Sequence, residues 1–135
     1  MKKKFLNLGE FFKMSLARTR IKIFVEGLGE ARGELVSFLA PRTVNMLIRK
    51  LPFEGKAVNQ NGNVYFPISI RMGVEKGKNL VEPGMLGYWP QADSFCVFYS
   101  KLKLYNLVNI VGKIVENLEI FKLVKNGSII KVEKL

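Results

Sequence analysis

The side chains that could bind a small molecule gather in one stretch of the chain. Between Val81 and Tyr99 lie a Pro-Gly turn, two short apolar strands and the only tryptophan, Trp89, with no histidine and no neighbouring pair of carboxylates. Aromatic rings beside a few hydrogen-bonding groups favour a groove for a peptide segment or a small apolar ligand over a reaction centre. We predict that Tyr88, Trp89, Gln91 and Phe98 of this stretch form the groove together with two residues from earlier in the chain, Tyr65 and Arg71.

Catalytic groups of the common kinds are scarce. The chain has 135 residues and no histidine, which excludes hydrolases with a histidine-containing triad, imidazole metal sites and histidine acid catalysis. Asp93 is the sole aspartate, and most of the glutamates fall at predicted turns or strand edges, where carboxylates are solvated rather than paired. We therefore expect no catalytic residue, no metal site and no cofactor.

Cys96 is the only cysteine, so the chain cannot form an internal disulfide. It stands between Phe95 and Val97 in a strand-like run, which predicts a buried and inert thiol. This agrees with a reducing, cytoplasmic compartment. No run of eighteen apolar residues appears, so we expect no membrane span.

The charge of +11 is concentrated at the amino terminus, where six basic residues stand against Glu10 in the first twenty positions. No stripe of arginines alternates with aromatic residues, and so solvated surface charge is favoured over nucleic-acid binding. We predict a basic extension over residues 1–19 and one domain over 20–135.

Two interpretations of the extension stay open. It lacks the continuous apolar stretch of a secretory signal, and it could be a loosely docked segment. Alternatively, it is an amphipathic segment, with Phe5, Leu8, Phe11 and Phe12 on one side, that docks on a neighbouring subunit or an anionic surface, or a basic segment that binds an anionic polymer. The second predicts retention on heparin that disappears when residues 1–19 are removed.

Alternating apolar residues predict strands from Arg20 onward. Ile21, Ile23 and Val25 share one face of the first strand. Turn residues predict hairpins at Gly27–Gly33, at Asn59–Asn63 with its Asn-Gly pair, and at Pro90–Asp93. The expected strands cover roughly 20–26, 34–38, 56–58, 64–72, 85–89, 95–99, 108–115 and 128–133, and residues 73–83 are expected to be a loop.

Two short helices are predicted. Pro41 opens the first, with Val44, Leu47, Ile48 and Leu51 on one apolar face. Asn117 is the expected N-cap of the second, over 118–124. About eight antiparallel strands in so small a chain favour a mainly β fold closed into a barrel, with the helices covering its ends.

Several separated motifs resemble a known family. The segments Ala40-Pro-Arg-Thr-Val-Asn-Met-Leu47 and Ile110-Val-Gly-Lys-Ile-Val-Glu-Asn-Leu118 look like parts of a cyclophilin. Four further segments resemble, more closely, the small cyclophilin-like domain family of bacteria and archaea. They are Leu51-Pro-Phe-Glu-Gly55, Val64-Tyr-Phe66, Val81-Glu-Pro-Gly84 and Gly87-Tyr-Trp-Pro90. The resemblance covers roughly residues 20–134 and implies a cyclophilin-like β-barrel.

The resemblance to true cyclophilins does not carry their activity over. Those enzymes seat a proline ring in an aromatic pocket while an arginine donates a hydrogen bond to the prolyl nitrogen, which weakens the double-bond character of the peptide bond. On the strand that carries this arginine in cyclophilins, the present chain has Tyr65, Phe66 and Pro67, and the nearest residue with a guanidinium group is Arg71. We therefore predict a binding module without isomerase activity, with a weak prolyl isomerase using Arg71 as the alternative.

Overall fold

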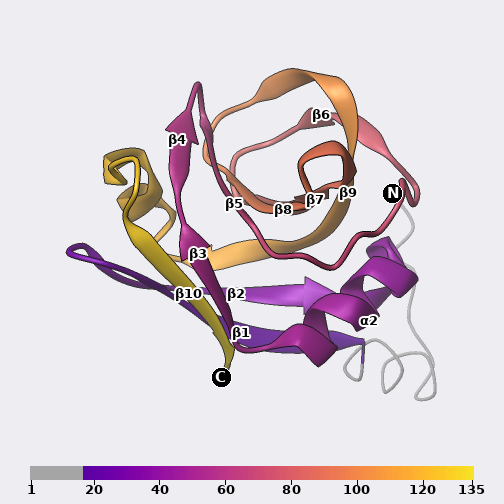
Figure 1. Ribbon diagram of the computed structural model, residues 1–135, viewed down its shortest axis with the longest axis horizontal. Helices are drawn as coiled ribbons and strands as arrows, with labels where there is room; N and C mark the ends of the chain where they lie inside the picture. The colour runs from indigo at the N-terminus through magenta and orange to yellow at the C-terminus, as the bar shows by residue number, and fades with distance from the viewer. Residues whose placement is uncertain (1–16) are drawn as a thin grey trace, which may run out of the picture.

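The structure, a computed structural model, describes residues 17–135, which fold mainly into antiparallel strands with one α-helix (Figure 1). The strands are β1 (Arg18–Val25), β2 (Gly29–Val36), β3 (Phe53–Lys56), β4 (Val58–Gln60), β5 (Asn63–Pro67), β6 (Lys78–Val81), β7 (Met85–Trp89), β8 (Ser94–Phe98), β9 (Leu102–Glu116) and β10 (Ile129–Lys134). The helix is α2 (Pro41–Lys50), and three 3-10 turns are η1 (Ser37–Leu39), η2 (Pro90–Ala92) and η3 (Leu118–Leu123). No helix among these residues is long and apolar enough to cross a membrane.

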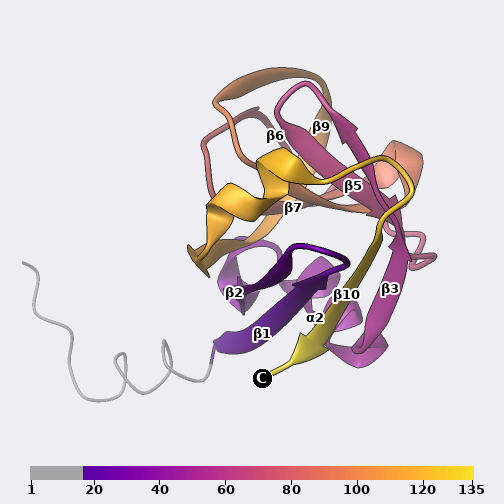
Figure 2. The ribbon, with the colours of Figure 1, turned by 90° about the vertical axis from the view of Figure 1, so that its left-hand side faces the viewer.

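The mainly β antiparallel class is confirmed, whereas the expected closure into a barrel is not confirmed, because the sheet is open. Hydrogen-bonded neighbours follow the open path β3-β10-β1-β2-β9-β7-β8-β5-β4, with β6 paired to β9 off this path. Figure 2 shows β10 beside β3 at one end of the path. The end strands of the path are β3 and β4, which are consecutive in the chain and separated by Ala57. β3 pairs with β10 and β4 pairs with β5, and no ladder joins β3 to β4.

Turn chemistry sets the hairpins where the sequence predicts them. β4 and β5 are joined by Asn61 and Gly62, with φ of 49° and 93°, the positive values that a two-residue turn of this kind needs. β1 and β2 pair through a turn at Gly27 that is shorter than the predicted Gly27–Gly33, because β2 already begins at Gly29. β7 and β8 pair through η2 and Asp93, whose φ is 48°. These hairpins bring chain-distant aromatic residues onto neighbouring strands.

β8 is buried on both faces and separates two apolar clusters. Phe95 and Val97 lie in the main core, which also contains the buried face of β1 and Val44 and Leu47 of α2. Cys96 and Phe98 point the other way, into a smaller cluster. In Figure 1 the long strand β9 arcs around β5, β8 and β7, and it supplies Val108 to the smaller cluster.

The predicted first helix is confirmed, and its N-terminus is capped from a distance. Ala40, at the N-cap, offers no side-chain hydrogen bond. Glu75 takes that role, because its carboxylate accepts the backbone N–H of Arg42 and of Thr43 at 3.0 and 2.8 Å and the hydroxyl of Thr43 at 2.8 Å. The buried Asn109 accepts the N–H of Glu75 at 2.7 Å, which joins β9 to this cap.

Three sequence expectations need correction. The second predicted helix, over 118–124, forms as the 3-10 helix η3 (Leu118–Leu123), and Asn117 makes no capping side-chain hydrogen bond to it, because its amide donates to the carbonyl of Glu30 at 2.8 Å. The strand predicted to reach Met72 ends at Pro67, since Ser69 and Arg71 have positive φ. The predicted loop at 73–83 contains β6.

Candidate functional site

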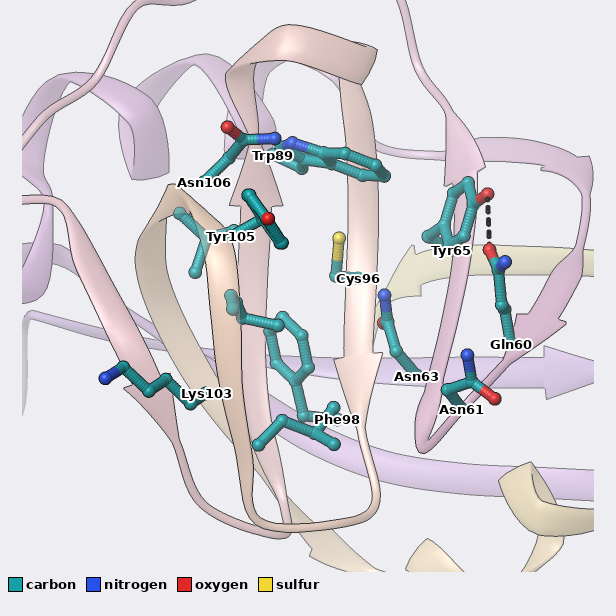
Figure 3. A pocket seen from close by; sticks show the side chains of 13 residues that line it. Gln60, Asn61, Asn63, Tyr65, Trp89, Cys96, Phe98, Lys103, Tyr105 and Asn106 are labelled. Carbon is teal, nitrogen blue, oxygen red and sulfur yellow. Dashed lines mark hydrogen bonds between the residues drawn. The ribbon is translucent and has the colours of Figure 1, made fainter.

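A pocket of about 350 Å³ lies over the smaller apolar cluster (Figure 3). Its walls come from the β4–β5 hairpin, from β7 and β8, and from the first half of β9. The lining residues are Gln60, Asn61, Asn63, Tyr65, Trp89, Cys96, Phe98, Leu102, Lys103, Leu104, Tyr105, Asn106 and Val108. The volume falls within the range of small-molecule sites.

Two aromatic rings from different strands form one wall. Tyr65 and Trp89 meet edge to face, with ring centroids 5.4 Å apart and an interplanar angle of 81°. They come together because β5 and β7 both pair with β8, Tyr65 opposite Cys96 and Trp89 opposite Ser94. The hydroxyl of Tyr65 donates a long hydrogen bond of 3.4 Å to Gln60, so the wall presents ring faces and polar atoms together.

The floor is apolar and depends on a glycine. The ring of Phe98, 1% exposed, lies across β7 at Gly87, where an added Cβ would stand 2.9 Å from Cε2 of the ring. A side chain at position 87 would therefore displace Phe98. Beside it, Cys96 is fully buried, and burial raises the pKa of its thiol far above the ordinary value, which leaves the thiol protonated and unreactive.

The first half of β9 closes the pocket on the remaining side. Leu102, Leu104 and Val108 belong to the smaller cluster, whereas Lys103 and Tyr105 are exposed at the rim. Lys103 is the only lining residue with a formal charge at neutral pH, and Figure 3 shows its side chain directed away from Phe98 and Trp89. The interior is therefore apolar with polar amides at its edges.

The structure brings three of the predicted groove residues together and places three elsewhere. Tyr65, Trp89 and Phe98 line the pocket, whereas Tyr88, Arg71 and Gln91 do not. Tyr88 is fully buried on the opposite face of β7, where its hydroxyl donates to Asp93 at 2.6 Å and accepts the N–H of Met72 at 3.1 Å.

Arg71 and Gln91 are both exposed. Arg71 has a φ of 52°, and its backbone N–H donates to Asp93 at 2.8 Å. Gln91 lies in η2, which leads away from the end of β7. Neither Arg71 nor Gln91 lines the pocket beside Trp89.

Sequence reasoning missed the β9 wall and the amides of the β4–β5 hairpin. The segment from Ser100 to Asn106 reads as a short connection, yet Leu102 and Leu104 alternate with Lys103 and Tyr105. That period of two could have identified the wall. Asn61 and Asn63 were assigned only to a turn, and nothing in their residue types separates a turn amide from one that lines a pocket.

Most of the basic extension predicted over residues 1–19 lies outside the described residues, which begin at residue 17. Its last residues enter β1, which begins at Arg18.

Among residues 17–135, no three His, Cys, Asp or Glu side chains lie close enough together to hold a metal ion.

Comparison with known proteins gives one family and a shared fold. A family model described as cyclophilin-like matches residues 19–133. The hypothetical protein AF2241 from Archaeoglobus fulgidus aligns with a TM-score of 0.73 and 26% identity, over 88% of this chain and 96% of that one. McbB, solved in complex with tryptophan, aligns with a TM-score of 0.72 and 17% identity, over 84% of this chain and 44% of McbB. No curated protein matches.

Proposed function

The chain belongs to the cyclophilin-like family, and from this premise we propose that it is a binding module without isomerase activity. Its pocket holds a small apolar ligand or a short peptide segment against Tyr65, Trp89 and Phe98. The observation that carries the proposal is the edge-to-face pair of Tyr65 and Trp89 standing over a floor of buried Phe98 in a pocket of about 350 Å³.

The chemistry of the lining supports binding rather than reaction. Aromatic and aliphatic surface covers the floor, and amide side chains of Gln60, Asn63 and Asn106 offer hydrogen bonds at the edges. An apolar concavity with a few polar groups is typical of a ligand site. No carboxylate lies among the lining residues, so the pocket offers no acidic partner for a cation.

Trp89 is the only tryptophan, so its fluorescence reports on the pocket alone. We would titrate the protein with the uncharged probe N-phenyl-1-naphthylamine and with a short, end-capped proline-containing peptide that lacks tryptophan. Tryptophan itself, chosen because McbB was solved with it, would be followed by the amide shifts of pocket residues, since its own fluorescence overlaps that of Trp89. The expected result is a saturable change in Trp89 fluorescence with at least one probe.

Tyr65→Ala should weaken that binding about tenfold, because it removes half of the aromatic wall. Phe24→Ala is the matched control, since Phe24 is an exposed aromatic residue on β1 and does not line the pocket. It should bind as the wild type does. The proposal is wrong if no probe gives a saturable change, or if both variants bind equally well.

A further inference from the structure

Two buried polar atoms without a partner border the pocket. Among the described residues, the buried side-chain nitrogen and oxygen atoms that make no hydrogen bond are Nε1 of Trp89 and Oδ1 of Asn63. Both residues line the same pocket. A buried donor or acceptor without a partner is unfavourable and rare in native proteins, so the coincidence of both at one pocket points to a ligand that supplies the missing partners.

The two residues lie on strands that flank β8. Trp89 is paired with Ser94 and Asn63 with Phe98, four residues further along β8, so their backbone positions are offset along the strand by roughly 14 Å at 3.4 Å per residue. Between these positions β8 presents only Cys96 on this face, and the ring of Phe98 continues the apolar surface. A ligand that reaches both atoms is therefore elongated, with an apolar middle.

The charges of the lining favour an uncharged ligand. No carboxylate is present to balance a cation, and the ammonium of Lys103 lies at the exposed rim rather than beside either unpartnered atom (Figure 3). A buried charge on the ligand would be left unpaired, at a large desolvation cost. Neutral hydrogen-bonding groups meet the same atoms without that cost.

We propose that the ligand is an elongated, uncharged molecule with a hydrogen-bond acceptor at one end, for Nε1 of Trp89, and a donor at the other, for Oδ1 of Asn63. This inference rests on the proposed function and specifies the ligand class of the same pocket. Both atoms are buried, and in Figure 3 the amide of Asn106 points toward the indole of Trp89. Entry of the ligand therefore displaces Asn106.

Three bicyclic aromatic compounds of similar size separate the two contacts. Quinoline carries an acceptor, indole carries a donor, and naphthalene carries neither; all are uncharged at pH 7. The indole N–H of Trp89 gives one resonance in a ¹H–¹⁵N spectrum, because the chain has one tryptophan. Quinoline should move that resonance downfield and bind about fivefold more tightly than naphthalene. Indole should also bind about fivefold more tightly than naphthalene, but without moving the Trp89 resonance downfield.

Paired variants assign each contact to its residue. Trp89→Phe keeps an aromatic ring without the donor, so it should abolish the advantage of quinoline and keep that of indole. Asn63→Leu should do the reverse. Asn45→Leu is the control, because Asn45 is exposed on α2, and it should change neither. For each variant, backbone amide dispersion shows whether the fold is retained, and pocket amide shifts measure the binding.

Each failure has its own signature. Equal binding of the three compounds would overturn the inference and leave the proposed function standing, whereas no shifts at pocket residues with any compound would count against the proposed function itself. A Trp89 resonance that responds to Asn106→Leu in the free protein, and not to quinoline, would show that Asn106 already accepts the indole N–H. That outcome overturns the acceptor half of the inference.

Discussion

The hydroxyl of Tyr88 donates a 2.6 Å hydrogen bond to Oδ1 of Asp93, across the hairpin that carries the pocket wall. The same oxygen accepts the backbone N–H of Ile70 at 3.0 Å and of Arg71 at 2.8 Å. One carboxylate therefore holds the irregular segment after β5 against the end of β7. Trp89 follows Tyr88 directly, so this contact also fixes where the wall of the pocket stands.

Replacing Asp93 by alanine should lower the free energy of unfolding by about 2 kcal/mol at pH 7, because three donors lose their acceptor. Partial burial opposes ionisation, but the hydrogen bonds from Tyr88, Arg71 and Ile70 together hold the pKa of Asp93 below its ordinary value of 3.8. The carboxylate's contribution is thus present above about pH 4 and is lost as the pH falls through the folded-state pKa.

Urea unfolding of wild type and Asp93→Ala at pH 7 and at about pH 3 measures this. The difference between the two proteins should shrink at the lower pH. Asp93→Asn is the control, since asparagine tolerates positive φ and keeps an acceptor oxygen but does not titrate. A difference that stays constant with pH would contradict the assignment.

Tyr88→Phe tests the other partner of the same bond. Burial, followed by the hydrogen bond to Asp93, raises the pKa of Tyr88 to about 12. A raised pKa contributes stability that is present below pH 10 and is lost as the pH rises through about 12. The absorbance titration of tyrosinate in the wild type should show a component near 12 that Tyr88→Phe lacks, and the variant should be about 1 to 2 kcal/mol less stable at pH 7. Identical titration curves would refute this.

Glu75→Ala should destabilise the protein by about 1 to 2 kcal/mol, because α2 has no capping side chain of its own. Although partial burial opposes ionisation, the hydrogen bonds from Arg42 and Thr43 hold the pKa of Glu75 below its ordinary value. The loss should be measured by thermal unfolding at pH 7. Glu54→Ala is the matched control, since Glu54 is exposed on β3, and an equal effect of both substitutions would exclude the capping role.

Local signals in the sequence predict the elements well but not the faces that they present. Asn61-Gly62 and Pro41 have strong backbone preferences, and the hairpin and α2 form where they predict. Alternation correctly sends Tyr88 and Trp89 in opposite directions. Which of them faces the core depends on the acceptor at Asp93 and the N–H of Met72, and local pattern does not encode partners from another segment.

The corrected features share a cause, because each depends on contacts between distant segments. β6 has little apolar alternation of its own and forms by pairing with β9. The path of paired strands is open because β3 pairs with β10 at one end, β4 pairs with β5 at the other, and β3 does not pair with β4. The pocket likewise requires β9 to curve over β8. The only sign of this wall in the sequence is the alternation of Leu102 and Leu104, which line the pocket, with polar or exposed residues.

Arg71 provides a direct test of the isomerase alternative. The wild type and Arg71→Ala should both leave the protease-coupled cleavage of a prolyl peptide at its background rate, with an active cyclophilin as positive control. The reason is positional, since Arg71 is exposed and does not line the aromatic pocket, whereas the isomerase mechanism needs a guanidinium within hydrogen-bond reach of the seated proline. Acceleration by the wild type that Arg71→Ala removes would restore the isomerase assignment.

Gly87→Ala tests whether the floor of the pocket depends on close packing. The new methyl group would stand 2.9 Å from the buried ring of Phe98, so the ring must move, and the space open to it lies in the pocket. Overpacking of this kind costs about 1 to 3 kcal/mol, and probe binding followed by Trp89 fluorescence should weaken about tenfold. Gly73→Ala is the matched control, because nothing lies within 4 Å of its added Cβ. Should Gly87→Ala bind the probe as tightly as Gly73→Ala does, Phe98 does not form the floor on which the ligand rests.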